Sequence, residues 1–284
     1  MERLQEILSG LSFTGHTSEM SYTPEEMEKM RVDSFNSSDG SLHLEDDYNC
    51  ATCRNKGLIM KAVEIREGYW STTSNECKCM GVRRTIKRMQ RSGLKNIIRD
   101  YTFQKFDASQ SWQQTIKQAA QDYAQFPAGW FFIGGQSGAG KTHICTAICR
   151  EFLLAGRVVK YMLWRDEIVK IKNAVNEGEE YTSLIDSYKK TPILYIDDLF
   201  KTGKAADGTK QKPTAADVNV AFEILNFRYN DPALLTIISS ECTINDILDI
   251  DEAVGGRIFE RAKTAFSLKP DRSRNYRLKG VVEL

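Results

Sequence analysis

The sequence lacks the features that would place the chain in or across a membrane. No apolar run approaches the roughly 18 consecutive residues that a membrane-spanning helix needs. The N-terminus does not show the cationic and then apolar pattern of a secretory signal. These absences predict a cytoplasmic protein, in which the seven cysteines are expected to be free thiols or metal ligands rather than disulfides.

The chain also lacks a large net charge, because 39 basic and 38 acidic side chains give a net charge of only +1. No global field therefore indicates a nucleic-acid or membrane partner. The two signs of charge are nevertheless distributed unevenly along the chain. In residues 1–49 acids are opposed only by Arg3, Lys29 and Arg31, whereas residues 78–99 contain no acid at all. This asymmetry suggests separate partner surfaces.

A glycine-rich segment supplies the strongest functional signal. Residues 135–142 fit the phosphate-binding pattern G-x-x-x-x-G-K-[ST], between an apolar run at 130–133 and a helical pattern from 143. Glycines let backbone N–H groups surround phosphates, and the helix adds the positive end of its dipole. Lys141 would reach the β- and γ-phosphates of ATP, and the Thr142 hydroxyl would ligate Mg²⁺. The expected nucleotide-binding residues are Gly135, Gln136, Ser137, Gly138, Ala139, Gly140, Lys141 and Thr142.

Two further strand ends carry polar side chains. The apolar residues 193–196 end in Asp197 and Asp198, which is typical of a Walker B segment. Asp197 is expected to hold Mg²⁺, and Asp198 to polarise the water that attacks the γ-phosphate. Ser240 and Glu241 follow the next apolar run and are candidates for sensing the γ-phosphate.

Alternating strand and helix patterns predict the fold class. They favour a three-layer α/β domain with a parallel sheet and with ligands at the carboxyl ends of its strands. The expected strands are 130–133, 158–162, 193–198, 234–238 and 265–268, and the expected helices include 109–126, 143–154, 165–175, 180–189 and 215–229.

Two close cysteine pairs indicate a metal site. Cys50 and Cys53, followed by Cys77 and Cys79, resemble a four-cysteine zinc site of the ribbon type, with a small hairpin expected between the pairs. Four thiolates can complete a tetrahedron around one Zn²⁺, which would supply folding energy to a module too small for its own core. The C-x-C spacing of the second pair is tighter than usual. Four ordinary thiols are the alternative, and His43 is a possible substitute ligand.

The expected domain organisation follows from these motifs. A chain of 284 residues can hold one sizeable core and a smaller module. We expect an acidic, weakly ordered arm at 1–46, with a helix start signalled by Thr23 and the following proline and acids. A zinc module with a basic helix would occupy 47–92, a linker and helix 93–127, and the ATPase domain 128–284. The basic helix is either a solvated charged face or a contact for nucleic-acid phosphates.

From about Asn49 onward the sequence resembles DnaC/DnaI-type replicative helicase loaders. The resemblance rests on the cysteine module, the phosphate loop and the segments Ile-Asp-Asp, Ser-Ser-Glu and Gly-Arg-Ile-Phe-Glu-Arg. Such loaders are AAA+ ATPases of bacteria and phages. The resemblance implies an ATP-dependent protein that places the hexameric replicative helicase on single-stranded DNA when replication starts. It also implies that the zinc module contacts the helicase and that the ATPase domain handles DNA and associates with copies of itself.

The resemblance assigns roles to several arginines. Arg261 matches the arginine finger that reaches a neighbouring subunit's ATP site, with Arg257 as its companion on the same helix. Arg274 matches the second sensor arginine, although Arg272 and Arg277 lie close in sequence. The chain departs from many AAA+ proteins in having aspartate at the second Walker B position and in lacking a full helical lid.

Two other functions fit part of this pattern. A transposition regulator of the IstB type shares the ATPase core but generally lacks the cysteine module, so zinc and helicase binding would separate the two functions. A small-molecule kinase also uses a phosphate loop. The paired Walker B acids and the arginines suited to acting in trans count against a kinase.

Overall fold

The computed structural model describes residues 22–91, 94–203 and 211–278, which form two compact units. The first unit contains residues 22–39 and Leu58–Glu76. The second contains Gly40–Gly57 and the described residues from Cys77 onward. This division differs from the boundaries expected from sequence, because the cysteine loops belong to the same unit as the nucleotide-binding sheet.

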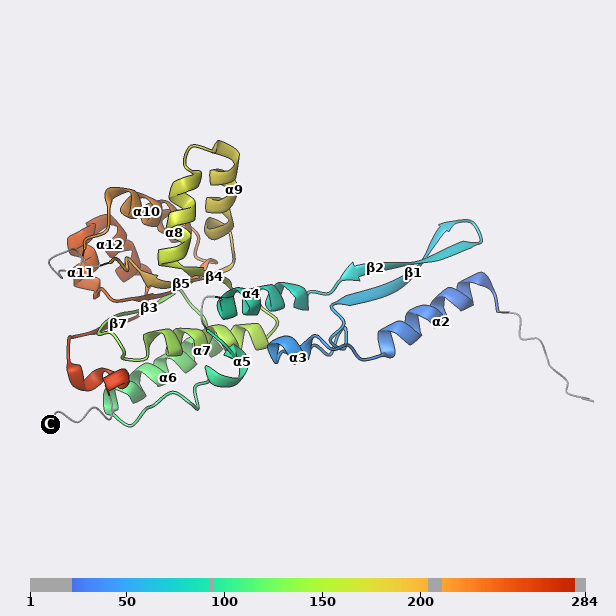
Figure 1. The fold of residues 1–284 in the computed structure, drawn as a ribbon, viewed down its shortest axis with the longest axis horizontal. Coiled ribbons are helices and arrows are strands. Elements are labelled where there is room, and N and C mark those ends of the chain that lie inside the picture. Colours follow the sequence, from blue (N-terminus) through green and yellow to red (C-terminus); the bar gives the residue numbers. More distant parts are fainter. Residues whose placement is uncertain (1–21, 92–93, 204–210, 279–284) are drawn as a thin grey trace, which may run out of the picture. The chain divides into compact units, whose positions relative to one another are not determined.

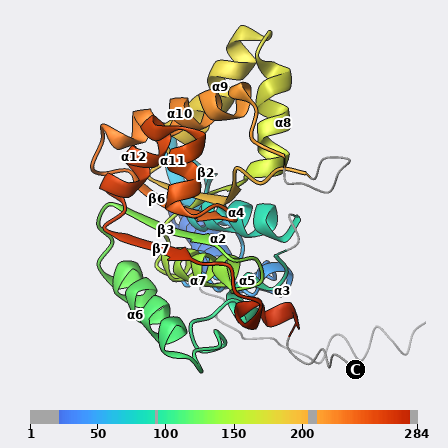
Figure 2. The ribbon, with the colours of Figure 1, turned by 90° about the vertical axis from the view of Figure 1, so that its left-hand side faces the viewer.

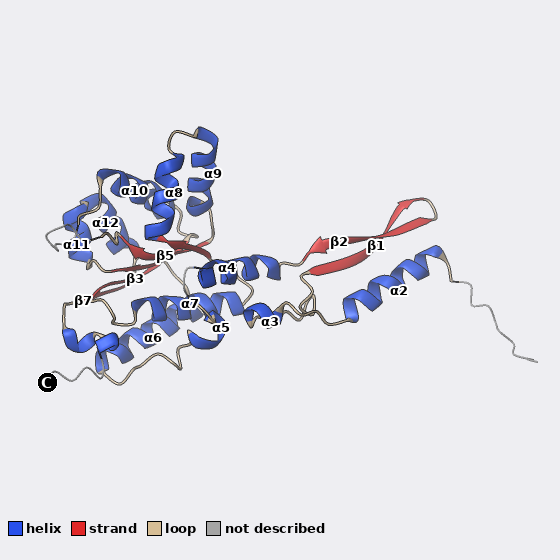
Figure 3. Ribbon diagram, viewed as in Figure 1, coloured by secondary structure: helices blue, strands red, loops and turns tan. Residues whose placement is uncertain are grey.

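The first unit is a helix with a β-hairpin (Figure 3). Helix α2 (Pro24–Ser37) begins at a capping box, in which the Thr23 side chain accepts the Glu26 N–H and the Glu26 carboxylate accepts the Thr23 N–H. The predicted helix start is therefore confirmed. Helix α2 is followed in this unit by the antiparallel strands β1 (Leu58–Arg66) and β2 (Tyr69–Glu76). The predicted hairpin between the cysteine pairs is confirmed as well.

The second unit holds the remaining elements (Figure 1). Its helices are α3 (His43–Asp46), α4 (Cys79–Arg91), α5 (Ile97–Asp100), α6 (Ser111–Gln125), α7 (Lys141–Leu154), α8 (Trp164–Ala174), α9 (Gly178–Lys189), α10 (Ala215–Tyr229), α11 (Ile244–Ile250) and α12 (Glu252–Arg261). Its strands are β3 (Trp130–Gly135), β4 (Lys160–Leu163), β5 (Ile193–Leu199), β6 (Leu235–Ser240) and β7 (Thr264–Leu268), and two short 3₁₀ turns follow at Arg272–Arg274 and Tyr276–Leu278.

The five strands form one parallel sheet in the order β4-β5-β6-β3-β7. Helices α6 and α7 lie on one side of it and α8 to α12 on the other, which gives the predicted three layers (Figure 2). Strands β3, β5 and β6 are buried along nearly their whole length, as is typical of parallel sheets covered on both faces. The α/β fold class predicted from the sequence is therefore confirmed.

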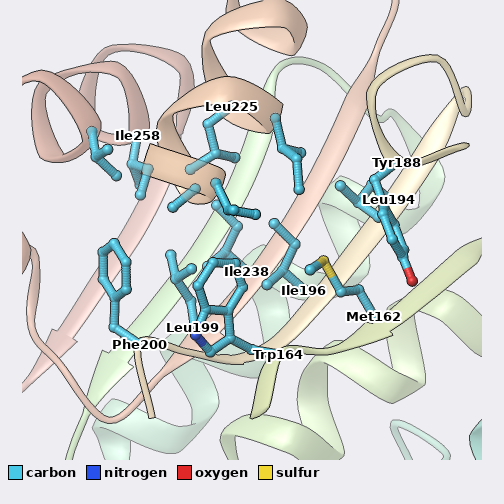
Figure 4. Close-up of a cluster of buried hydrophobic side chains, with 14 of the residues drawn as sticks. Met162, Trp164, Tyr188, Leu194, Ile196, Leu199, Phe200, Leu225, Ile238 and Ile258 are labelled. Carbon is cyan, nitrogen blue, oxygen red and sulfur yellow. The ribbon is translucent and has the colours of Figure 1, made fainter. Parts of the chain in front are cut away.

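A hydrophobic core lies between the sheet and helices α8 to α12. Trp164, Phe200, Leu199, Ile238 and Ile258 belong to one buried cluster (Figure 4). The ring of Phe200 meets that of Trp164 edge-on at 5.6 Å between centroids. This contact holds the chain directly after β5 in place.

No helix among the described residues is long and apolar enough to cross a membrane.

Candidate functional site: a nucleotide pocket and a cysteine cluster

The phosphate loop connects β3 to α7 at the carboxyl end of the central sheet. Gly135, Gly138 and Gly140 adopt positive φ values of 99°, 75° and 84°, which favour glycine. A side chain at Gly135 would also meet the carbonyl oxygen of Leu268 on the neighbouring strand at 2.0 Å. Helix α7 has no side-chain cap at its start, so its first N–H groups remain available to a phosphate group.

Lys141 is folded back onto this loop. Its Nζ donates to the carbonyl oxygens of Gly135 at 2.9 Å and Gln136 at 2.8 Å. Burial lowers the pKa of Lys141, while the nearby charges of Asp198 and Glu241 act in the opposite direction. An ammonium in this position is desolvated and can exchange its carbonyl partners for phosphate oxygens.

Asp197 is buried at the end of β5 and surrounded by hydroxyl groups. The Thr142 hydroxyl donates to its Oδ1 at 3.2 Å, as do Ser239 at 2.5 Å and Tyr195 at 2.8 Å. Tyr161 on β4 donates to Oδ2 at 2.9 Å. Burial raises the pKa of Asp197, and the hydrogen bonds from Ser239 and the two tyrosines oppose that effect. The structure thus brings Thr142 and Asp197 together, as the two predicted Mg²⁺ ligands require.

Of the other predicted site residues, Asp198 and Glu241 lie in a cavity and Ser240 lies outside it. Asp198 and Glu241 line a cavity of about 500 Å³ together with Lys141 and Thr142. Ser240 is not among the lining residues, and its hydroxyl donates to the Leu199 carbonyl oxygen at 2.6 Å. Its neighbour Ser239 contacts Asp197 instead, so Ser240 ties β6 to β5 away from the cavity.

Two segments that the motifs did not identify complete the cavity. Tyr101 and Phe106, from the chain before α6, line one side, and both rings pack on His143 with centroids 5.4 and 5.6 Å away. Tyr276 and Arg277 line another part of the cavity wall. The Tyr276 N–H donates to the carbonyl oxygen of Gly138 in the phosphate loop at 2.9 Å. The aromatic residues at 101–106, before α6, were the only sequence signal for the first segment.

The arginines assigned by resemblance lie outside this cavity. The Arg274 guanidinium lies 5.5 Å from the Trp112 ring centroid and 3.4 Å from Asp271, so Arg277 is the arginine of the tail that lines the cavity. Arg257 bonds Asn226 at 2.9 Å. Arg261 donates to the Asp231 carbonyl oxygen at 3.2 Å, directly before β6.

Arg261 therefore lies near the amino ends of the strands. The phosphate loop begins at the carboxyl end of β3, which is 6 residues long. Such a strand spans about 20 Å. Arg261 is consequently too far away to touch a phosphate bound to its own chain.

The four predicted zinc ligands converge in the second unit. The sulfur atoms of Cys50, Cys53, Cys77 and Cys79 lie within 4.8 Å of one another, and all four side chains are buried. Cys50 and Cys77 are 3.9 Å apart at sulfur, and Cys53 and Cys79 are 3.5 Å apart. Tetrahedral zinc with bonds of about 2.3 Å requires sulfurs roughly 3.8 Å apart, so the cluster fits this ion. His43 is not part of the cluster.

A buried ion pair supports the cluster and corrects one expectation. Arg83 on α4 was expected to belong to a basic, exposed face, but its guanidinium is buried and bonds both carboxylate oxygens of Asp46, at 2.5 and 2.7 Å. It also donates to the Asn55 side-chain oxygen at 3.0 Å, which accepts the Cys50 N–H at 2.8 Å. Arg84, Lys87 and other basic residues of α4 remain on the outside. The sequence signal for this burial is helical periodicity, because Arg83 lies three residues before the buried Ile86 on α4.

The chain is similar to several known proteins. A protein of Bacillus subtilis strain 168, "Phage-like element PBSX protein XkdC", is 29% identical over 82% of this chain and 88% of its own length. The "Replicative helicase loader DnaC" of Escherichia coli K12 is 27% identical over 44% of this chain and 51% of its own length, so this chain spans about half of that relative. A solved structure, "Crystal structure of the DnaC helicase loader", is 18% identical, covers 61% of this chain and 98% of its own, and has a TM-score of 0.49.

The pattern of one protein family matches residues 74–261, a span that includes the phosphate loop, both Walker B acids and Arg261 and covers more than half of the chain. The chain belongs to the family of IstB-like ATP binding proteins, and it is related to helicase loaders.

Proposed function

We propose that this protein is an ATP-dependent loader that delivers a replicative DNA helicase to single-stranded DNA when replication begins. The observation that carries the proposal is the joint presence of two sites in one chain. A cavity is lined by residues of the phosphate loop and by Asp198, and Thr142 of that loop bonds Asp197. A four-cysteine cluster precedes the loop in the sequence. The relationship to a protein described as a replicative helicase loader supports this assignment.

In this proposal the cavity binds and hydrolyses ATP. The loop residues 135–142 would surround the phosphates, and Thr142 with Asp197 would hold Mg²⁺, which neutralises phosphate charge. Asp198 would polarise the attacking water, and Glu241 would respond to the γ-phosphate. Tyr101 and Phe106 offer an aromatic surface to the nucleotide base.

The remaining parts would engage the macromolecular partners. The cysteine cluster would bind one Zn²⁺, and residues 1 to about 92 would contact the helicase. The exposed basic residues of α4, among them Arg84 and Lys87, are suited to the phosphates of single-stranded DNA. Arg261, with Arg257 nearby, would complete the ATP site of a neighbouring copy. The role of second sensor, first given to Arg274, fits Arg277 better because Arg277 lines the cavity.

Co-purification with the replicative helicase of the same cell tests this proposal. The full-length chain should retain the helicase, and the amount retained should differ between ATP and no nucleotide. Lys141→Ala, which removes the cation for the β- and γ-phosphates, should abolish that difference while leaving the Cys cluster intact. Absence of a complex under every nucleotide condition would contradict the loader assignment.

The family match is also compatible with a second function, because transposition regulators of the IstB type share this ATPase core. Such a protein would act on DNA in transposition and would not bind the helicase. The same co-purification, together with zinc analysis, separates the two functions.

A further inference from the structure

Lys201 lines the nucleotide cavity together with Lys141 and Lys105. The Lys201 Nζ lies 2.6 Å from Oδ2 of Asp198 and 3.4 Å from Oε1 of Glu241. All three side chains line the cavity that contains the phosphate loop. None of the sequence motifs includes Lys201, and the proposed reaction assigns it no task.

The local backbone holds Lys201 in this place. Asp198 and Phe200 adopt positive φ values of 60° and 59°, and the Lys201 N–H donates to the Asp198 carbonyl oxygen at 2.9 Å. The Phe200 ring is anchored in the core against Trp164 (Figure 4). Non-glycine residues adopt such conformations only where the surrounding structure imposes them. The tight turn therefore directs the lysine back over the end of β5.

The position of Lys201 affects the charge of the cavity. Asp198 and Glu241 are two negative groups in a cavity that has to accept the negative phosphates of a nucleotide. Lys201 lies between them and compensates both. Burial acts to lower the pKa of Lys201, but its bonds to Asp198 and Glu241 raise it overall, so the side chain stays cationic. At 34% exposure the side chain also has room to move.

We infer that Lys201 is a further phosphate-binding cation of this cavity, held between Asp198 and Glu241 until the terminal phosphate of a nucleoside triphosphate attracts it. A diphosphate lacks that group and leaves the ion pairs in place. Lys201 thereby makes the site distinguish the triphosphate from the diphosphate. Its departure from Asp198 frees the carboxylate that would polarise water. The inference rests on the part of the proposed function that assigns ATP to this cavity.

Equilibrium binding of two magnesium nucleotides tests the inference. The full-length protein and its variants are titrated with ADP and with an ATP analogue whose β–γ bridge cannot be hydrolysed. Lys201→Met should weaken binding of the analogue by about tenfold or more, as expected for a lost bond between charged groups, and should change ADP binding much less. Lys201→Arg should retain most of the preference for the analogue, because the positive charge is kept.

Lys190→Met is the matched control. Lys190 Nζ lies 2.6 Å from a carboxylate oxygen of Asp186, the same separation as in the Lys201–Asp198 pair, but on the outer surface of the domain at 62% exposure. This variant should bind both nucleotides as the unmodified protein does. Thermal unfolding of each variant shows whether the fold is retained.

Three results would overturn the inference. Lys201→Met could lose affinity equally for both nucleotides, or lose affinity for neither. It could also bind the analogue more tightly, which would mean that the ion pair only inhibits nucleotide binding. If the unmodified protein binds neither nucleotide, the assignment of ATP to the cavity fails together with the inference. If it binds both and Lys201→Met keeps its preference, only the inference fails.

Discussion

At the scale of single residues, the ion pair between Arg83 and Asp46 is buried and should contribute to stability. Both side chains are almost fully buried, at 2% and 1% exposure. Arg83 also reaches the Tyr48 carbonyl oxygen at 2.9 Å and, through Asn55, the backbone of Cys50. The pair therefore joins α4, which begins at Cys79, to the loop that carries the first cysteine pair.

Replacing Arg83 should destabilise the protein strongly. Arg83→Met leaves the Asp46 carboxylate buried without a counter-charge, which costs about 3–5 kcal/mol of unfolding free energy. Lys87→Met on the same helix breaks an exposed pair with Glu45, 2.9 Å long, and should cost only about 0–1 kcal/mol. Denaturant unfolding with zinc present measures both. An Arg83→Met variant as stable as Lys87→Met would show that the buried pair does not hold the module together.

At the scale of elements, the sequence predicted the sheet well because its strands are continuous apolar runs. Strand β5 was expected at 193–198 and is found at Ile193–Leu199, and helix α10 was expected and found at Ala215–Tyr229. Long-range contacts were not predictable in this way. Tyr161 bonds Asp197 from the neighbouring strand, and Tyr276 bonds Gly138 from the far end of the chain. No local pattern in one sequence indicates such pairings.

The cysteine cluster joins elements that are far apart in the chain, so metal removal should act on them together. We expect one Zn²⁺ per chain, and Cys77→Ala should lose it because three thiolates cannot complete the tetrahedron. Cys149→Ala, at a fully buried cysteine on α7 outside the cluster, should keep it. Metal analysis of the purified proteins measures both. A zinc content near zero, with far-UV circular dichroism unchanged by a chelator, would exclude a structural zinc.

At the scale of the whole molecule, the role that we propose for Arg261 requires assembly of several copies. Arg261 lies near the amino ends of the strands and the ATP cavity lies at their carboxyl ends, so the arginine can reach a γ-phosphate only in another copy. An arginine of this kind stabilises the charge that develops on the transferred phosphoryl oxygens, an effect of about 10³–10⁵ in rate in related enzymes. Alone, Arg261→Ala should therefore retain little ATPase activity.

Mixing two inactive variants tests this arrangement. Lys141→Ala lacks a working ATP cavity but keeps Arg261. Arg261→Ala keeps the cavity but lacks the arginine. Interfaces that join the intact cavity of one to the intact arginine of the other should restore part of the ATPase activity. Glu252→Gln, which changes an exposed side chain at the start of α12, is a control for general damage to this helix. If the mixture stays inactive although the variants assemble, Arg261 is not shared between subunits.

In the proposed function, ATP in this cavity drives placement of a replicative helicase on DNA. The most direct measurement follows a labelled helicase hexamer onto closed circular single-stranded DNA, which a closed ring cannot enter by threading over an end. With the unmodified protein and ATP, helicase should remain on the DNA after a salt wash, and with Lys141→Ala it should not. Helicase retention that is the same with Lys141→Ala, or without this protein altogether, would contradict the account.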